Sequence, residues 1–193
     1  MKSFKQFIKE MPERLNDIGD SEEYMKSSHK APRAPGPYDY DEEHGEIEDG
    51  HTMNSRTFKS KNDEEPDSES LPHTYWASHP DHEGIKASGS TTGKNRDTFK
   101  VNHVSKDPES SVSGSDFYAH ILDTGLHKFI ESDNKQTAGG ESIWHRLSHD
   151  YNDVHVTRHD KDGNEIPLHR GENWNKNFTD EHGKQSTFRA TLK

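Results

Sequence analysis

Apolar residues are dense in one part of the chain, the stretch Gly114–Leu147, and sparse in most of the remainder. In its first half, apolar positions three and four apart indicate a short helix, and Gly125 is its expected end. A compact apolar run at Leu126–Ser132 then predicts a buried strand, and a second helical stripe follows it. The core that these elements are expected to share consists of Phe117, Tyr118, Ile130, Ile143 and Trp144.

The start of the first helix carries the pattern of a helix cap. Ser113 and Asp116 are three residues apart, as in a capping box, with Asp in place of the usual Glu or Gln. Thr137 is the expected cap of the second helix. Backbone N–H groups at Ser113, Gly114 and Ser115 would lie at a helix N-terminus, an arrangement that can bind a pyrophosphate. A capped helix without a ligand is the alternative interpretation.

Alternating apolar and polar positions predict strands on both sides of this stretch. Unbroken alternation would place His103 on the same strand face as Phe99 and Val101, in line with core residues. In a later strand, Thr157 is predicted to point outward. The predicted strands and hairpins are His73–Ser78, Ile85–Ser90 with Asp97–Ser105, Val154–His169 and Ser186–Leu192. This order of elements predicts an α+β fold, a small mixed or antiparallel sheet with two short helices packed on it.

The chain divides into three segments of different composition. Residues 1–18 can form an amphipathic helix, which either docks on the folded domain or inserts into a groove of a partner. Its apolar face contains Phe4, Phe7, Ile8 and Met11. Residues 19–70 contain acidic runs and few apolar side chains, which predicts a disordered acidic linker. Residues 71–193 make up the predicted folded domain.

The composition excludes several classes of function. The chain of 193 residues has 25% hydrophobic residues and a formal net charge of -11, so one core cannot extend over its whole length. The absence of cysteine excludes disulfides and thiolate metal sites. The acidic charge balance disfavours sequence-independent DNA binding, which needs a basic surface. No apolar run approaches the roughly 20 residues of a membrane span.

The histidines provide one pair with metal-ligand spacing. His145 and His149 are four residues apart on the second predicted helix, on the face opposite Trp144, so both are expected to face water. No carboxylate-bearing zinc motif surrounds them, and no metal is expected. The sequence also contains no GxSxG motif, P-loop or dinucleotide fingerprint.

The first ten residues, MKSFKQFIKE, resemble the short leaders of many proteins of large tailed bacteriophages. Some such leaders direct a protein into the capsid. The resemblance implies a phage protein that is located in the host cytoplasm, the virion or both. It also implies that a host or phage protein is the partner of the apolar helix face.

The stretch Gly114–Leu147 resembles a second pattern of tailed-phage proteins. In that pattern a helix reading xFYxxL leads to a strand ending in Ser-Asp, and then to QT/S-x-G-G-x-x-(I/V)-W-x-x-L. The matching residues are Phe117, Tyr118, Ile121, Ser132, Asp133, Gln136, Thr137, Gly139, Gly140, Ile143, Trp144 and Leu147. Proteins with this pattern are similar to GNAT-type N-acetyltransferases, so the resemblance implies a GNAT-like domain over residues 71–193.

Such a domain implies acyl transfer from acetyl-CoA to an amine. Ser113, Gly114 and Ser115 would bind the pyrophosphate, and His103 or Asp133 would accept the amine proton. The cofactor loop of the family usually reads Gln/Arg-x-x-Gly-x-Gly/Ala, and this chain has ESSVSGSD instead. The structural alternatives are a core-edge role for His103 and a turn-capping role for Asp133.

Two further hypotheses treat the protein as non-catalytic. In the first, a virion or host-takeover protein uses the same domain as a scaffold for protein contacts. In the second, the acidic chain is a decoy for DNA-binding proteins, which rests on the net charge of -11.

Overall fold

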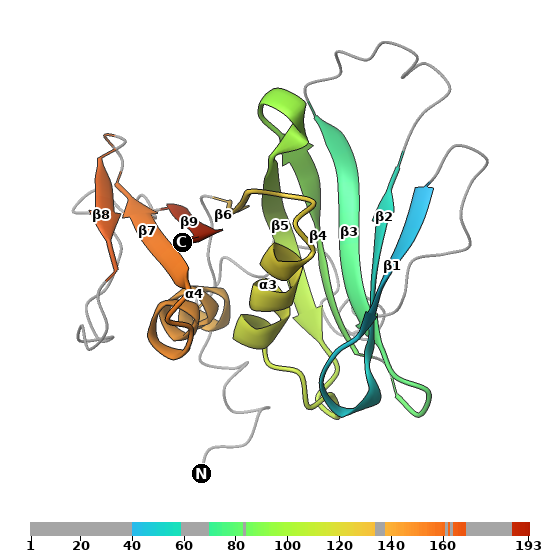
Figure 1. The fold of residues 1–193 in the computed structure, drawn as a ribbon. Coiled ribbons are helices and arrows are strands. Elements are labelled where there is room, and N and C mark those ends of the chain that lie inside the picture. Colours follow the sequence, from blue (N-terminus) through green and yellow to red (C-terminus); the bar gives the residue numbers. More distant parts are fainter. Residues whose placement is uncertain are drawn as a thin grey trace, which may run out of the picture.

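The described part of the chain folds around one sheet of nine strands, on which two helices pack (Figure 1). The computed structural model describes residues 40–58, 70–82, 84–133, 138–160, 162, 164–168 and 187–193. The elements in chain order are β1 (Tyr40–Glu46), β2 (Thr52–Thr57), β3 (Leu71–Ser78), β4 (Ile85–Thr92), β5 (Thr98–Lys106), α3 (Gly114–Asp123), β6 (Phe129–Ser132), α4 (Ala138–Asp150), β7 (Val154–His159), β8 (Glu165–Pro167) and β9 (Thr187–Leu192). The predicted α+β class with a mostly antiparallel sheet is therefore confirmed.

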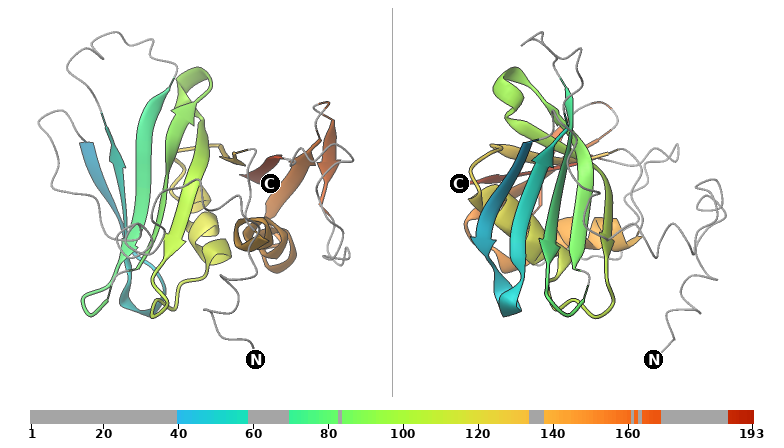
Figure 2. Two further views of the ribbon diagram at one scale, coloured as in Figure 1. Left: turned by 180° about the vertical axis from the view of Figure 1, so that it is seen from behind. Right: turned by 90° about the vertical axis from the view of Figure 1, so that its right-hand side faces the viewer.

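The first five strands form an antiparallel meander, in which each strand pairs with its neighbour in sequence (Figure 2). The predicted hairpin between the fourth and fifth strands is confirmed, and its turn passes through Gly93. Gly93 has a φ of 83°, a left-handed conformation that favours glycine because a Cβ would clash with the backbone. The meander thus supplies one continuous face on which a helix can pack.

The only parallel pair among the described strands joins β5 to β6. Parallel neighbours cannot be connected by a tight turn, so the chain crosses between them through α3. Figure 1 shows α3 lying against the meander. The N-terminus of α3 consequently follows the carboxyl end of β5.

The last strand, β9, lies inside the sheet, between β6 and β7. Its residue Ala190 pairs with Ile130 on one side and with Val156 on the other, and all three side chains are buried. β9 therefore joins β6 to β7, two strands that come earlier in the sequence, into one continuous sheet.

The predicted core is confirmed as one buried cluster. The side chains of Phe117, Tyr118, Ile130 and Trp144 are at most 2% exposed, and Ile143 is partly buried against them. Trp144 connects the two helices to the sheet, because its ring lies 5.1 Å from that of Tyr118 and 5.8 Å from that of Phe188.

The local signals at the start and end of α3 are also confirmed. The hydroxyl of Ser113 accepts the N–H of Asp116 at 3.1 Å, and the Asp116 carboxylate accepts the N–H of Ser113 at 3.2 Å. This is a complete capping box. Gly125 follows the helix with a φ of 66°. None of the described helices is long and apolar enough to cross a membrane.

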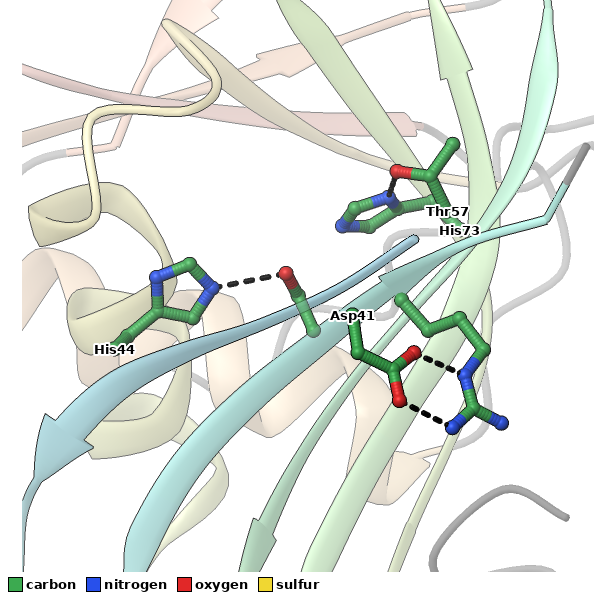
Figure 3. Close-up of polar contacts among 6 residues, drawn as sticks. Asp41, His44, Thr57 and His73 are labelled. Carbon is green, nitrogen blue, oxygen red and sulfur yellow. Dashed lines mark hydrogen bonds and ion pairs between the residues drawn. The ribbon is translucent and has the colours of Figure 1, made fainter. Parts of the chain in front are cut away.

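The prediction that residues 19–70 form a disordered linker is wrong for residues 40–57, which contain β1 and β2. The acidic side chains of β1 stay largely solvated because β1 is an edge strand. One of them, Asp41, forms a two-fold ion pair with the buried Arg56 of β2, and the second of its contacts is 2.6 Å long (Figure 3). The folded domain therefore includes residues before 71, and the leader at 1–18 lies outside the described residues.

Three smaller predictions are also wrong. The strand predicted at Leu126–Ser132 begins only at Phe129, and Leu126 is 39% exposed. Thr157 is buried, where an outward, solvated position was predicted. His145 is buried rather than solvated, because β9 places Phe188 beside its ring at 6.0 Å.

We expect the substitution Gly114→Val to lower the free energy of unfolding by about 1–3 kcal/mol, the usual cost of overpacking. A Cβ at Gly114 would lie 2.6 Å from Cδ1 of Ile143, so the larger side chain must displace the first turn of α3 or the Ile143 side chain. Urea denaturation followed by tryptophan fluorescence measures the effect. Ile143→Ala in the same chain should recover part of the loss, and strictly additive effects would contradict the contact.

Candidate functional site

The strand β5 is longer than its parallel partner β6, and this leaves one end of the pair open. The last described pair joins Val101 to Ser132, and the N–H of Asp133 then donates to the carbonyl of Val101 at 3.1 Å. β5 continues to Lys106 with no further β6 partner among the described residues. Where a strand extends beyond its neighbour, its edge can present backbone N–H and C=O groups to an extended ligand.

A β-bulge lies in β5 where the pairing with β6 stops. On the β4 side, Gly89 pairs with Val101 and Ser88 with His103, so Asn102 is an extra residue with no opposite partner. Glycine is required at position 89 because a Cβ there would lie 1.9 Å from a backbone oxygen of β5. A bulge bends its strand and redirects the side chains that follow.

The bulge overturns the predicted position of His103. His103 stands opposite Ser88, so it lies on the other face of the sheet from Val101 and is not in line with the core. Its ring is half-buried, and its pKa is lowered from 6.5, first by burial and then by the charge of Lys86. At neutral pH the ring is therefore a neutral imidazole, which can accept a proton.

Asp133 lies at the same end of the β5–β6 pair as His103. The N–H of Asp133 donates a hydrogen bond to the carbonyl of Val101, two residues before His103. The charge of the Asp133 side chain also affects Tyr118 of α3. The pKa of Tyr118 is raised first by burial and then by this charge. Both residues therefore lie near the same end of the strand pair, but His103 is on the face of the sheet away from Val101 and the core.

The predicted phosphate-binding residues at the start of α3 interact mainly with each other. The Ser113 hydroxyl lies 2.8 Å from that of Ser115 and accepts the N–H of Asp116. Gly114 packs against Ile143 of α4. The N–H groups of Gly114 and Ser115 have no hydrogen-bond partner in the part of the chain that the structure describes. Two donors therefore remain for a ligand, whereas Ser113 is occupied by the cap.

Asp116 brings a negative charge to this helix start. Burial alone would raise its pKa, but hydrogen bonds from Ser113 and Tyr151 outweigh burial and lower the pKa. The Tyr151 hydroxyl donates to the Asp116 carboxylate at 2.6 Å. An ionised carboxylate next to the helix N-terminus stabilises the helix and repels a second anion.

Two cations lie close to the same helix start. The pKa of Lys106 is lowered by burial, raised by the charge of Asp116 and lowered by that of Arg146, so the three charges interact. Lys106 and Arg146 are both exposed. Lys106 lies shortly before α3 in the sequence, whereas Arg146 comes from α4 and no local pattern places it near the start of α3. Asp107 and Glu109, in the loop before α3, add two further carboxylates to that of Asp116, so the two cations do not give this helix start a net positive charge.

Histidine and aromatic rings form a second group of titratable side chains, on the buried face of the meander. Nδ1 of His73 lies 2.9 Å from the Thr57 hydroxyl, and Nε2 of His44 lies 2.9 Å from the Ser55 hydroxyl (Figure 3). The His73 ring packs edge-on against that of His127 at 5.1 Å. Nε2 of His73 and Nε2 of His127 are buried and have no hydrogen-bond partner among the described residues.

These buried rings must be neutral in the folded protein. Burial is the largest cause that lowers the pKa of His73 to about 3, and His127 and His44 contribute further. The pKa of His127 is also lowered by burial. The hydrogen bond with the Arg96 carbonyl and the charge of Asp97 raise this pKa, but by less than burial lowers it. In the folded protein a charged ring would have neither water nor a hydrogen-bond partner at its buried Nε2. The charged form is therefore more stable in the unfolded chain, and protonation opposes folding.

The predicted histidine pair on α4 does not form a shared solvated face. His145 is buried, whereas the side chain of His149 is 48% exposed and its Nδ1 lies 2.7 Å from the Asp150 carboxylate. Across the described ranges, no group of three or more His, Cys, Asp or Glu side chains is arranged to hold a metal ion.

The fold and this geometry define an α+β domain with one parallel crossover and a charged, open strand end. No family model, curated protein or solved structure matches the chain.

We expect the free energy of unfolding to fall as the pH is lowered from about 6.5 towards 3. The pKa of His73 is about 3 in the folded state and 6.5 for a solvated ring in the unfolded chain. Between these two pH values the unfolded chain therefore binds more protons than the folded protein. His73 alone should contribute a slope of about 1.4 kcal/mol per pH unit. Urea denaturation between pH 7 and pH 5 measures this slope.

Two variants isolate the contribution of His73. His73→Asn should reduce the slope whatever it does to absolute stability, because the titrating ring is gone. His155→Asn, at an exposed position of β7, should leave the slope unchanged. Equal slopes for the wild type and His73→Asn would contradict the prediction.

Proposed function

We propose that the domain is a GNAT-like acyltransferase of a tailed bacteriophage, which transfers an acyl group from an acyl-CoA thioester such as acetyl-CoA to an amine. The supporting observation is the β5–α3–β6 unit, a parallel strand pair that is open at the carboxyl end of β5, beside the N-terminus of the connecting helix. Ligands of sheets with parallel strands bind beyond the carboxyl ends of those strands, where helix N-termini also point. A long, anionic thioester needs both an extended edge and a phosphate site.

The residues at the start of α3 fit a phosphate group in part. Gly114 and Ser115 each offer an N–H that has no partner among the described residues, and Lys106 and Arg146 offer positive charge. Asp107, Glu109 and Asp116 oppose them with three negative charges, and the hydrogen bond from Tyr151 disperses only that of Asp116. In this proposal the helix start would hold one phosphate through two amides and two cations.

The open end of β5 would hold the reacting group. A backbone N–H of β5 beyond its pairing with β6 could stabilise the negative charge that would develop on the thioester oxygen. The amine nitrogen would attack the carbonyl carbon, the C–S bond would break, and coenzyme A would leave as a thiolate. His103 as a neutral imidazole, or Asp133 as a carboxylate, would accept the proton that the amine loses.

A second candidate function is a non-catalytic scaffold for contacts inside the virion or with a host protein. The observation that favours it is the closed state of the helix cap, in which Ser113, Asp116 and Tyr151 satisfy one another. In this case the same domain would present its surface to partners, and residues 1–18 would dock through Phe4, Phe7, Ile8 and Met11.

The acyltransferase proposal predicts that coenzyme A or acetyl-CoA at saturation raises the melting temperature by a few degrees. The double substitution of Lys106 and Arg146 by alanine should abolish this shift, because it removes both cations at the helix start. Lys100→Ala, elsewhere on β5, should leave the shift intact. No shift in the wild type, or an undiminished shift in the double variant, would contradict the proposal.

The scaffold proposal predicts that the protein is abundant in purified virions of the phage that encodes it. Quantitative mass spectrometry of particles should find it there and should define the first residue that remains. Deleting residues 1–18 should reduce its abundance in particles, whereas replacing Lys100 by alanine should not. Absence from particles would exclude the virion role.

A further inference from the structure

We propose that Ser110 is a nucleophile activated by His51, and that this pair cleaves small esters through an acyl-serine intermediate. Ser110 lies in the β5–α3 loop, residues 107–113, and His51 directly precedes β2. The proposal does not rest on acyl transfer from coenzyme A, because it uses neither the start of α3 nor the open end of β5.

The sheet register brings these two distant segments together. Ile85, the first residue of β4, pairs with Lys106 at the end of β5 and with Ala77 of β3. Ala77 pairs in turn with Met53 near the start of β2. The segment before β2 and the β5–α3 loop therefore lie at the same end of the sheet, as Figures 1 and 2 show. Two side chains that are 59 residues apart in sequence meet there.

Two hydrogen bonds give the pair the arrangement of a nucleophile and its base. Nδ1 of His51 lies 3.0 Å from the carbonyl oxygen of Glu48, which can only accept, so Nδ1 carries the proton. Nε2 is then the basic nitrogen, and the Ser110 hydroxyl donates to it at 3.2 Å. A nucleophile that is hydrogen-bonded to a base, with the base oriented by a third group, is the general pattern of nucleophilic catalysis. The Glu48 carbonyl takes the orienting role that a carboxylate has in a serine–histidine–aspartate triad.

The surroundings hold both members of the pair in place. Two histidine rings of the β3–β4 turn pack against the His51 ring, with centroids at 5.0 Å and 5.1 Å. The N–H of Ser110 donates to the carbonyl of Asp107 at 3.1 Å, and the N–H of Asp107 donates to the carbonyl of Gly84 at 2.8 Å. The loop is thereby fixed to the β3–β4 turn, and little reorganisation is needed before reaction.

The electrostatics of the pair suit a general base. The pKa of His51 is lowered from 6.5, first by burial, and the two neighbouring histidines lower it further. The hydrogen bond with Glu48 and the charge of Asp49 raise this pKa, but by less than burial lowers it. At neutral pH the ring is therefore neutral and can accept the Ser110 proton. The N–H of Ser111 has no partner among the described residues, and the N–H after a nucleophile is a common oxyanion donor.

Exposure and charge restrict the substrate. Ser110 is 5% exposed, whereas Glu109 and Ser111 on either side of it are exposed, so only an acyl group of a few atoms can approach the hydroxyl. The segments 47–51, 79–84 and 107–113 contain no lysine or arginine. Their carboxylates are Glu48, Asp49, Asp81, Glu83, Asp107 and Glu109. Because these charges repel an anionic donor such as acyl-CoA, the substrate class is a small neutral or cationic ester.

The reaction is that of a serine esterase. Oγ of Ser110 attacks the ester carbonyl carbon, and its proton moves to Nε2 of His51. The bond between the carbonyl carbon and the alcohol oxygen then breaks, and the leaving alcohol takes that proton. Water, with His51 again as the base, attacks the acyl-serine ester and releases the carboxylic acid and Ser110.

Covalent labelling of the full chain tests the proposal. A small, neutral alkyl fluorophosphonate should phosphonylate Ser110 at about pH 7.5, and tandem mass spectrometry should locate the adduct. Ser110 should react about 100-fold or more faster than the exposed Ser111, because general base catalysis contributes about that much. The same reagent should block hydrolysis of para-nitrophenyl acetate, and Ser110→Ala should remove the part of this activity that the reagent blocks.

Two measurements isolate the role of His51. His51→Gln should slow labelling of Ser110 by about 100-fold or more, whereas His155→Gln, at an exposed position of β7, should label like the wild type. Because His51 is fully buried and its substitution could unfold the chain, the pH profile of the wild type provides a second readout. The labelling rate should be nearly constant between about pH 7 and pH 9, above the pKa of His51, whereas an unactivated hydroxyl gains about tenfold per pH unit.

Three results would overturn the proposal: no adduct at Ser110, equal rates at Ser110 and Ser111, or a wild-type rate that rises about tenfold per pH unit. None of these results affects the melting-temperature shift expected with coenzyme A, so the failure of the esterase proposal can be told from that of the acyltransferase proposal.

Discussion

The parallel pairing of β5 with β6 is the constraint on which the rest of the structure depends. Because parallel neighbours need a crossover, α3 must run back along the sheet and bury its apolar side, including Phe117 and Ile121, against it. The same crossover places the start of α3 at the carboxyl end of β5, where two turns of the meander also lie. The open strand end and the two cations beside the helix start are therefore both located by one connection.

Features that depend on neighbouring residues could be predicted from the sequence. The capping box of Ser113 and Asp116 is one, and the helical core positions around Trp144 are another, since each is determined within one or two turns. β1 could not be predicted in this way. Its acidic side chains have the composition of a linker, and only pairing with β2, through contacts such as Asp41 with Arg56, makes it a strand.

The candidate site was harder to predict than the fold because its parts are distant in sequence. The positions of Ser113, Gly114 and Ser115 followed from the cap, but the approach of Arg146 to Lys106 depends on how α4 packs. One extra residue, Asn102, moved His103 to the other face, since a single insertion reverses every later side chain of a strand. No periodicity in β5 marks that bulge. Gly89 in the partner strand is the one local hint, because a glycine within a strand often accompanies a close backbone approach.

The low apolar content of the chain explains why histidines fill so many buried positions. With 25% hydrophobic residues, the meander completes its interior with neutral imidazole rings, such as His73 and His127 beside Phe99. A neutral imidazole packs like an aromatic ring, but it regains its affinity for a proton whenever the structure opens. Core packing and proton binding are therefore linked in this fold.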